Sequence, residues 1–129
     1  MFANMLKRTL FALMSLAILL GVSSTASAQK TTVIRVVIVK TDDPAAYAHA
    51  LESGKEIMKK LGLPTNIHVY QATYAGPNAG AVAVSIEYPS MVALAEAETK
   101  LRADKDYAAW IKGLDKIRTI VSDSVYREL

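Results

Sequence analysis

The sequence predicts an α+β fold in which a four-stranded antiparallel sheet carries helices on one face. Three observations indicate this class. Residues 31–40 and 81–88 are rich in β-branched side chains, as buried strands are. The stretch from Asp43 to Pro64 carries the start and stop signals of one helix. The segments then follow one another as strand, helix, strand, strand, helix, strand.

The first strand is expected over residues 31–40, TTVIRVVIVK, where Arg35 is the one charge inside an apolar run. Apolar side chains on both faces indicate a central strand. One register contains Ile34, Val36 and Ile38, and the other contains Val33, Arg35, Val37 and Val39.

The first helix is expected to begin at the N-cap Asp43, with Pro44 at its first position, and to end before Gly62. Its apolar stripe consists of Tyr47, Leu51, Gly54, Met58 and Leu61. A glycine inside a helix costs about 1 kcal/mol relative to alanine. We therefore expect Gly54 at a point where the helix approaches the sheet closely.

Residues 66–74 and 81–88 alternate in polarity and predict the second and third strands. The glycine-containing segment between them joins strand to strand, whereas a phosphate-binding loop joins a strand to a helix. Pro77 and Asn78 suit the centre of a type I turn, and Gly80 tolerates a positive φ. The segment is expected to be a hairpin loop.

Two further helical segments and one strand complete the chain. Ser90 is expected to cap a helix over residues 91–101, and Asp104 a second over 105–113. Residues 116–126 predict a fourth strand, which Ser122, Asp123 and Ser124 weaken toward an edge position.

The N-terminal residues 1–28 read as a cleaved secretory signal peptide. Lys7 and Arg8 precede an apolar run over residues 10–22, followed by small residues at 26–28. A membrane span needs about 20 apolar residues, more than this run supplies. We expect cleavage before Gln29, a single domain over residues 29–129, a periplasmic or secreted location, and no membrane attachment of the mature chain. The absence of cysteine excludes disulfides and thiol chemistry.

Positive and negative charges are interleaved in residues 29–129. Nucleic-acid binding instead concentrates Lys and Arg on one face, so we expect no nucleic-acid partner.

The element order is that of a ferredoxin-like split β-α-β sandwich. The chain resembles the dimeric α/β-barrel superfamily, and within it the small NIPSNAP-like proteins, in the segments VIRVVIVKTDDPAAY, ATYAGPNAGAVAVSIEYPS, RADKDYAAW and IRTIVSDSVYREL. In that superfamily two sheets pack face to face. The resemblance implies a homodimer, and we expect the face with Val33, Val37 and Val39 to form it because that apolar surface needs a cover.

Five residues are candidates for a site. His68 suits acid–base chemistry, although a strand histidine is more often satisfied by a neighbour or by water. A ligand is expected between sheet and helices, where His68, Tyr70 and Trp110 would meet. Arg35 and Glu87 are expected to pair at the dimer interface, in preference to an anion-binding role for Arg35. No closely spaced ligand pair indicates a metal, and none is expected.

Two functions remain open from the sequence. The first is a non-catalytic module that binds a small, mostly apolar ligand or a partner. The second is a cofactor-independent monooxygenase or isomerase with His68 as acid/base. No recognisable nucleophile or nucleotide fingerprint occurs, no cofactor is expected, and the first function is favoured.

Overall fold

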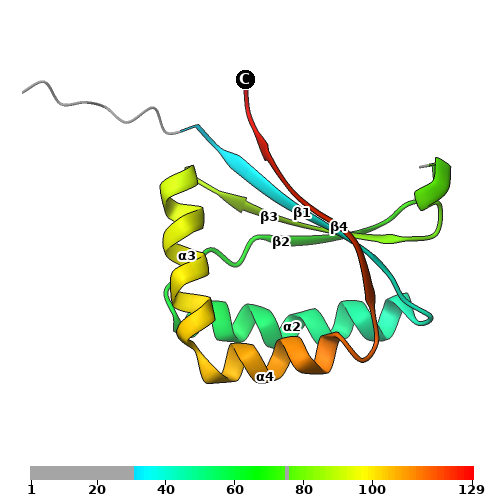
Figure 1. Ribbon diagram of the computed structural model, residues 1–129, viewed down its shortest axis with the longest axis horizontal. Coiled ribbons are helices and arrows are strands. Elements are labelled where there is room, and N and C mark those ends of the chain that lie inside the picture. Colours follow the sequence, from blue (N-terminus) through cyan, green and yellow to red (C-terminus); the bar gives the residue numbers. More distant parts are fainter. Residues whose placement is uncertain (1–30, 75) are drawn as a thin grey trace, which may run out of the picture.

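A computed structural model describes residues 31–74 and 76–129 (Figure 1). The expected signal peptide and its cleavage site lie outside these residues. The elements are β1 Val33–Lys40, α2 Pro44–Lys60, β2 Ile67–Gln71, the 3₁₀ turn η1 Gly76–Asn78, β3 Val82–Tyr88, α3 Met91–Ala103, α4 Lys105–Leu114 and β4 Thr119–Arg127. Within the described part of the chain, no helix has both the length and the apolar character of a membrane span.

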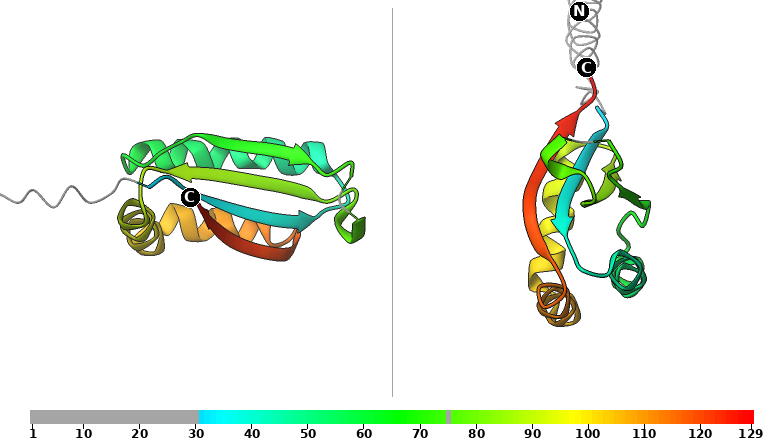
Figure 2. Two further views of the ribbon diagram at one scale, coloured as in Figure 1. Left: turned by 90° about the horizontal axis from the view of Figure 1, so that it is seen from above. Right: turned by 90° about the vertical axis from the view of Figure 1, so that its right-hand side faces the viewer.

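The four strands form one antiparallel sheet in the order β2-β3-β1-β4. The predicted α+β, ferredoxin-like class is therefore confirmed, with β1 and β3 central. Helices α2 and α4 lie side by side beneath one face of the sheet, and α3 stands at one end of it (Figures 1 and 2). The opposite face has no helix of the described chain over it.

Each helix begins at the residue that the sequence predicts, because a side-chain oxygen accepts a hydrogen bond from an otherwise unpaired backbone N–H of the first turn. The three bonds run from Ala46 N to Asp43 Oδ1 (2.9 Å), from Ala93 N to Ser90 Oγ (3.1 Å) and from Tyr107 N to Asp104 Oδ1 (2.7 Å).

The glycine-containing segment is a hairpin loop between β2 and β3, as expected. The backbone N–H of Ala79 donates to the carbonyl of Gly76 at 3.1 Å, which places Pro77 and Asn78 at the centre of the turn. Gly80 has a φ of 83°, the left-handed conformation that glycine adopts without strain.

The two faces of β1 are the reverse of those predicted. Val33 and Val39 are completely buried against the helices, and Arg35 and Val37 lie on the same side. The open face instead carries Ile34, Val36 and Ile38, which the register places opposite residues of β3 and β4. Both registers of this strand are apolar, so alternation alone cannot assign them. The prediction that Val33, Val37 and Val39 form a dimer interface is wrong.

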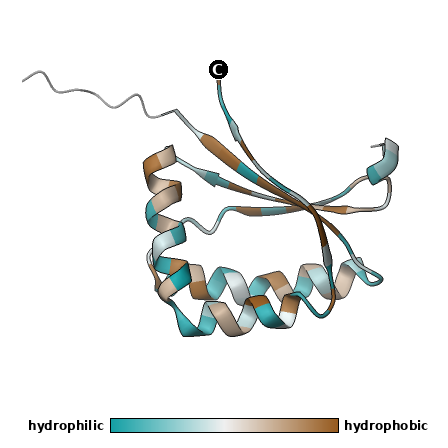
Figure 3. Cartoon of the chain, in the orientation of Figure 1, coloured by the Kyte–Doolittle hydropathy of each residue, from teal (hydrophilic) through white to brown (hydrophobic). Residues whose placement is uncertain are grey.

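Hydropathy colouring shows the apolar run along β1, in the middle of the sheet (Figure 3). We call the uncovered side the open face. It consists of Ile34, Val36, Ile38, His68, Tyr70, Ala83, Ser85, Glu87, Ser122, Ser124 and Tyr126.

The predicted stripe of α2 is confirmed, since Tyr47, Leu51, Gly54 and Met58 are buried. Gly54, however, approaches α4 and not the sheet. A Cβ built at this position would lie 2.2 Å from a ring carbon of Trp110. The indole N–H of Trp110 donates to the carbonyl of Ala50, one turn earlier, at 2.9 Å. Gly54 therefore provides the space in which the indole crosses α2.

Candidate functional site

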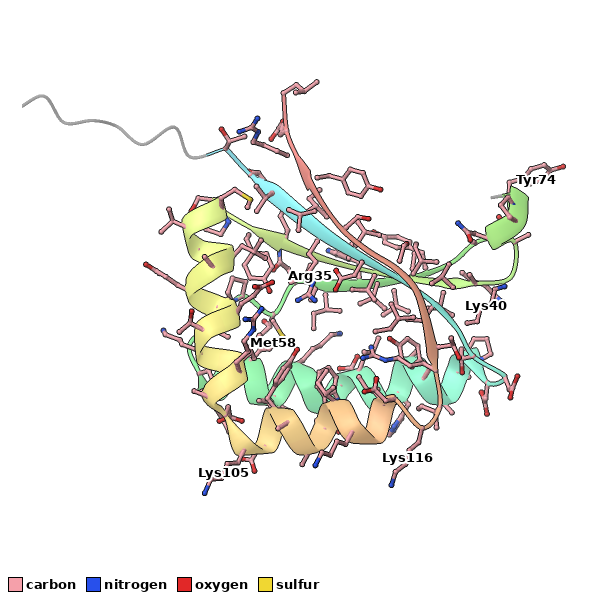
Figure 4. All side chains as sticks on the ribbon, viewed as in Figure 1. Arg35, Lys40, Met58, Tyr74, Lys105 and Lys116 are labelled. Carbon is pink, nitrogen blue, oxygen red and sulfur yellow. The ribbon has the colours of Figure 1, made fainter. Side chains whose placement is uncertain are left out.

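A cavity of about 80 Å³ lies between the sheet and the helices. It lies where Arg35 and Met58 point into the space between the two layers (Figure 4). Most of its wall is aliphatic or aromatic, and a few polar side chains enter it from several elements. The lining residues are Arg35, Val37, Tyr47, Leu51, Met58, Ile67, Val84, Ile86, Tyr88, Leu101, Tyr107, Trp110, Ile111, Arg118, Ile120 and Asp123.

Arg35 forms a two-point ion pair with Asp123 of β4. Its Nε lies 2.9 Å from Asp123 Oδ1, and its Nη2 lies 2.6 Å from Asp123 Oδ2. The Nη1 atom of Arg35 is 3.7 Å from Glu98 of α3, which in turn lies 3.4 Å from Arg102. These contacts link the central strand, the edge strand and α3 at one side of the cavity.

The expected pair between Arg35 and Glu87 does not form. Ile86 is the residue of β3 opposite Arg35, and Glu87 is opposite Ile34 on the open face. The two side chains therefore point to opposite sides of the sheet. The expectation that Arg35 needs a partner holds, but the partner is Asp123.

The ion pair shifts both groups toward their charged forms. The hydrogen bonds that Asp123 accepts from Arg35 lower the pKa of Asp123 below its usual range. Burial of the carboxylate opposes this shift with a smaller effect. The same hydrogen bond raises the pKa of Arg35. Both groups remain charged near neutral pH, and neither is poised to exchange a proton there.

Two tyrosines, Tyr88 of β3 and Tyr107 of α4, line the cavity near this ion pair. Burial raises the pKa of both phenols, and the positive charge of Arg35 partly opposes that effect. Both therefore stay protonated at neutral pH.

Arg118 is the second guanidinium in the wall of the cavity. Its side chain is only 8% exposed, and its Nη1 lies 3.2 Å from the hydroxyl oxygen of the buried Tyr47. The Nε and Nη2 atoms of Arg118 each donate to Asp115 Oδ1 at 3.2 Å. The charge of Arg118 is thus matched by the solvent-facing carboxylate of Asp115.

The expected meeting of His68, Tyr70 and Trp110 between sheet and helices is wrong. His68 and Tyr70 belong to the register of β2 opposite Ser85 and Ala83, on the open face, and their rings stack with centroids 6.2 Å apart. Trp110 alone lines the cavity, tilted against Tyr107 with ring centroids 5.6 Å apart. The sheet separates the histidine from the indole.

The sequence did not single out Asp123, Arg118, Tyr47 or Tyr88 as site residues. One signal was available for Asp123. It is a charge inside a β-rich strand, as Arg35 is, and two such opposite charges are candidates to pair across neighbouring strands. No comparable signal marks Tyr88, whose position depends on how α3 closes over the end of the sheet.

A second hollow, about 730 Å³ and wide open, lies where three loops meet at the end of the sheet that carries Lys40 and Lys116 (Figure 4). Its lining mixes cations with Asp42, Asp43 and Asp115. Arg118 lines this groove as well as the cavity. Within residues 31–74 and 76–129, no three His, Asp or Glu side chains are grouped so that they could hold a metal ion together.

The sheet order, the helices on one face and the mainly apolar cavity beneath the sheet together define a ferredoxin-like α+β protein with an internal pocket. No protein-family model and no curated protein matches the sequence.

Solved structures with the same fold include two NIPSNAP proteins. A NIPSNAP family protein from Agrobacterium tumefaciens is 20% identical, with a TM-score of 0.51 over 76% of this chain and 91% of that chain. An uncharacterized NIPSNAP-like domain protein from Burkholderia xenovorans is 16% identical, with a TM-score of 0.55 over 78% and 85%. The resemblance to NIPSNAP-like proteins is confirmed at the level of the fold.

SnoaB, a cofactor-independent oxygenase from Streptomyces nogalater, was solved in a mutant form and also shares the fold. It is 9% identical, with a TM-score of 0.55 over 74% of this chain and 90% of that chain. Identities this low establish a common fold, and a common fold does not define an activity.

Proposed function

We propose that this protein binds a small, mostly apolar molecule in the cavity between the sheet and the helices. The observation that carries the proposal is the composition of the wall, in which aromatic and aliphatic side chains surround a few convergent polar groups. Drug-sized ligands occupy pockets of about 300–1,000 Å³. A cavity of about 80 Å³ therefore suits a much smaller molecule.

The protonation states in the cavity favour a binding role over acid–base catalysis. A general acid or base works best with a pKa near the operating pH. Asp123 is shifted below its usual range, and Tyr88 and Tyr107 are shifted above theirs. His68, the earlier candidate, lies on the far side of the sheet.

An oxygenase function is the second candidate, because SnoaB, which shares the fold, is a cofactor-independent oxygenase. It is tested by incubating the purified protein with phenols, quinols and lactones and following oxygen uptake and product formation. Turnover that falls about a hundredfold in a folded cavity variant, such as Tyr107→Phe, would favour the enzyme over the binder.

The proposed assembly is a homodimer formed by the open face. Ile34 is 38% exposed, and its neighbour Tyr126 on β4 is 60% exposed. Further along β1, Val36 and Ile38 are flanked on both neighbouring strands by small residues. Apolar sheet surface of this kind is commonly covered by a second sheet, about 10 Å away. The helices already cover the other face of the sheet. A second copy on the open face would therefore leave the cavity between the sheet and the helices unchanged.

Export remains part of the proposal on sequence grounds alone. The basic, apolar and small-residue segments of residues 1–28 support a cleaved signal, which N-terminal sequencing of protein recovered outside the cytoplasm would test. A retained Met1 would contradict it.

The binding proposal is tested by mass spectrometry of protein purified gently from its native compartment. Wild type is compared with Ile111→Phe, which adds bulk to the half-buried wall of the cavity, and with His68→Ala on the open face. We expect a small molecule to accompany wild type and His68→Ala but not Ile111→Phe. A compound retained equally by all three would place the binding site elsewhere.

A further inference from the structure

Tyr88 and Tyr107 carry hydroxyl groups at the cavity that no side chain or backbone group of the described residues engages in a hydrogen bond. Other polar side chains in the wall are paired. Arg35 pairs with Asp123, and Tyr47 with Arg118. By contrast, neither the Tyr88 hydroxyl nor the Tyr107 hydroxyl makes a hydrogen bond within residues 31–74 and 76–129. A phenol in this position normally has a partner.

The position of the Tyr88 hydroxyl follows from its burial and from its lack of a partner among the described residues. The residue is only 1% exposed, yet among the described residues no side-chain nitrogen or oxygen is both completely buried and unpaired. Its oxygen must therefore border accessible space, and the space that Tyr88 lines is the cavity. Tyr107 lines the same cavity from α4, and the charge of Arg35 acts on both phenols.

The charges around these phenols determine what kind of partner suits them. Burial keeps both tyrosines protonated, so each can donate a hydrogen bond. Arg35 is engaged by Asp123 and lies near Glu98, and it therefore offers no unmatched positive charge to an anion. Arg118, the other guanidinium of the wall, is engaged by Asp115, so neither cation of the cavity is left unmatched for an anionic ligand.

We infer that the ligand is a small neutral carbonyl compound whose oxygen accepts hydrogen bonds from Tyr88 and Tyr107 while its hydrocarbon part contacts the apolar walls. This inference rests on the proposed function and specifies its ligand class. The cavity of about 80 Å³ admits a small molecule only, and we take a ketone of four or five carbons as the size to test.

The test uses cyclopentanone as the probe, with cyclopentane and cyclopentanecarboxylate as its hydrocarbon and anionic counterparts. Dissociation constants are measured by NMR titration, and the carbonyl stretching frequency of bound cyclopentanone by infrared difference spectroscopy. Tyr88→Phe and Tyr107→Phe each remove one donor and keep the ring. Tyr70→Phe, on the open face, is the matched control.

We expect cyclopentanone to bind more tightly than either counterpart. The carbonyl stretch of bound cyclopentanone should lie at a lower frequency than that of cyclopentanone in a water-free solvent. Each cavity variant should weaken binding about 3- to 10-fold and reverse part of the frequency shift, because a single net hydrogen bond is worth that factor. Tyr70→Phe should change neither quantity. Because the stretch reports on the oxygen itself, a purely structural role of the tyrosines would not move it.

Three results would overturn the inference. Equal binding of cyclopentane and cyclopentanone, unaffected by the cavity variants, would refute the phenol donors and leave the apolar cavity as a binding site. Tighter binding of the carboxylate would show that the ligand is an anion. Binding of none of the three probes by the mature wild-type protein would refute the inference and the proposed function together. If circular dichroism shows that one of the two variants is unfolded, the other variant and the carbonyl stretch measured with the wild-type protein decide whether the phenols donate to the ligand.

Discussion

Arg35 shows what a single residue can and cannot reveal in this chain. A guanidinium within an apolar central strand needs a partner, and that requirement can be read from the sequence. The identity of the partner cannot, because both registers of β1 are apolar and either could face the helices. The structure resolves this by placing Arg35 beside Asp123, at the cavity and away from the open face.

The ion pair predicts how stability depends on pH. The folded-state pKa of Asp123 lies below its usual value of about 3.9, so its stabilising contribution is present above that value and is lost as the pH falls through the lowered pKa. Asp123→Asn should therefore reduce the free energy of unfolding near pH 7, by no more than about 1 kcal/mol because the pair is partly exposed.

Urea unfolding near neutral pH and near pH 2 measures this effect. The difference between wild type and Asp123→Asn should shrink at the lower pH, while Asp42→Asn, in an exposed loop, should match wild type at both. An undiminished difference near pH 2 would mean that the ion pair is not its source.

At the scale of elements, the sequence predicts helix starts better than strand faces. Asp43, Ser90 and Asp104 act locally, through one hydrogen bond each to the first turn, and all three were identified from the sequence. Which face of β1 or β2 meets the helices depends on the whole sheet. The alternation of β2 does not say which of its faces meets the helices, and His68 was therefore expected in the cavity although it lies on the open face.

The contact between α2 and α4 depends on Gly54. Replacing it with alanine adds helix propensity worth about 1 kcal/mol but places a methyl group inside the volume of the Trp110 ring. Displacing a packed indole costs about 1–3 kcal/mol, so we expect Gly54→Ala to destabilise the protein and to change Trp110 fluorescence.

Gly113 provides the matched control for this substitution, because it also lies in a helix and a Cβ there would meet no atom within 4 Å. Gly113→Ala should leave stability unchanged or increase it slightly. Thermal unfolding followed by circular dichroism compares the two, and equal melting temperatures would mean that the indole moves aside freely.

At the scale of the whole molecule, the sheet divides two distinct environments. Its helix side holds the core and the cavity, while its open face carries Ile34, Val36 and Ile38 toward solvent. A second copy packed on that face, as proposed above, would cover these side chains. The sequence predicts the need for such a cover, but both apolar registers of β1 satisfy the prediction equally.

Two neighbouring substitutions test the assembly. Val36→Asp introduces a charge in the middle of the open face and should give a folded monomer. Val37→Asp introduces the same charge beside the core cluster of the helix side, so it should lower the stability of the subunit by several kcal/mol. Light scattering and urea unfolding separate these outcomes, and a normal dimer of Val36→Asp would contradict the proposed interface.

Intermolecular nuclear Overhauser effects show whether the ligand lies in the cavity between the sheet and the helices. The mature protein is labelled at its methionine and isoleucine methyl groups and saturated with cyclopentanone. We expect cross-peaks from the ligand to Met58, Ile67 and Ile111, which line the cavity. Cross-peaks to Ile34 and Ile38 on the open face, with none to Met58, would contradict this expectation.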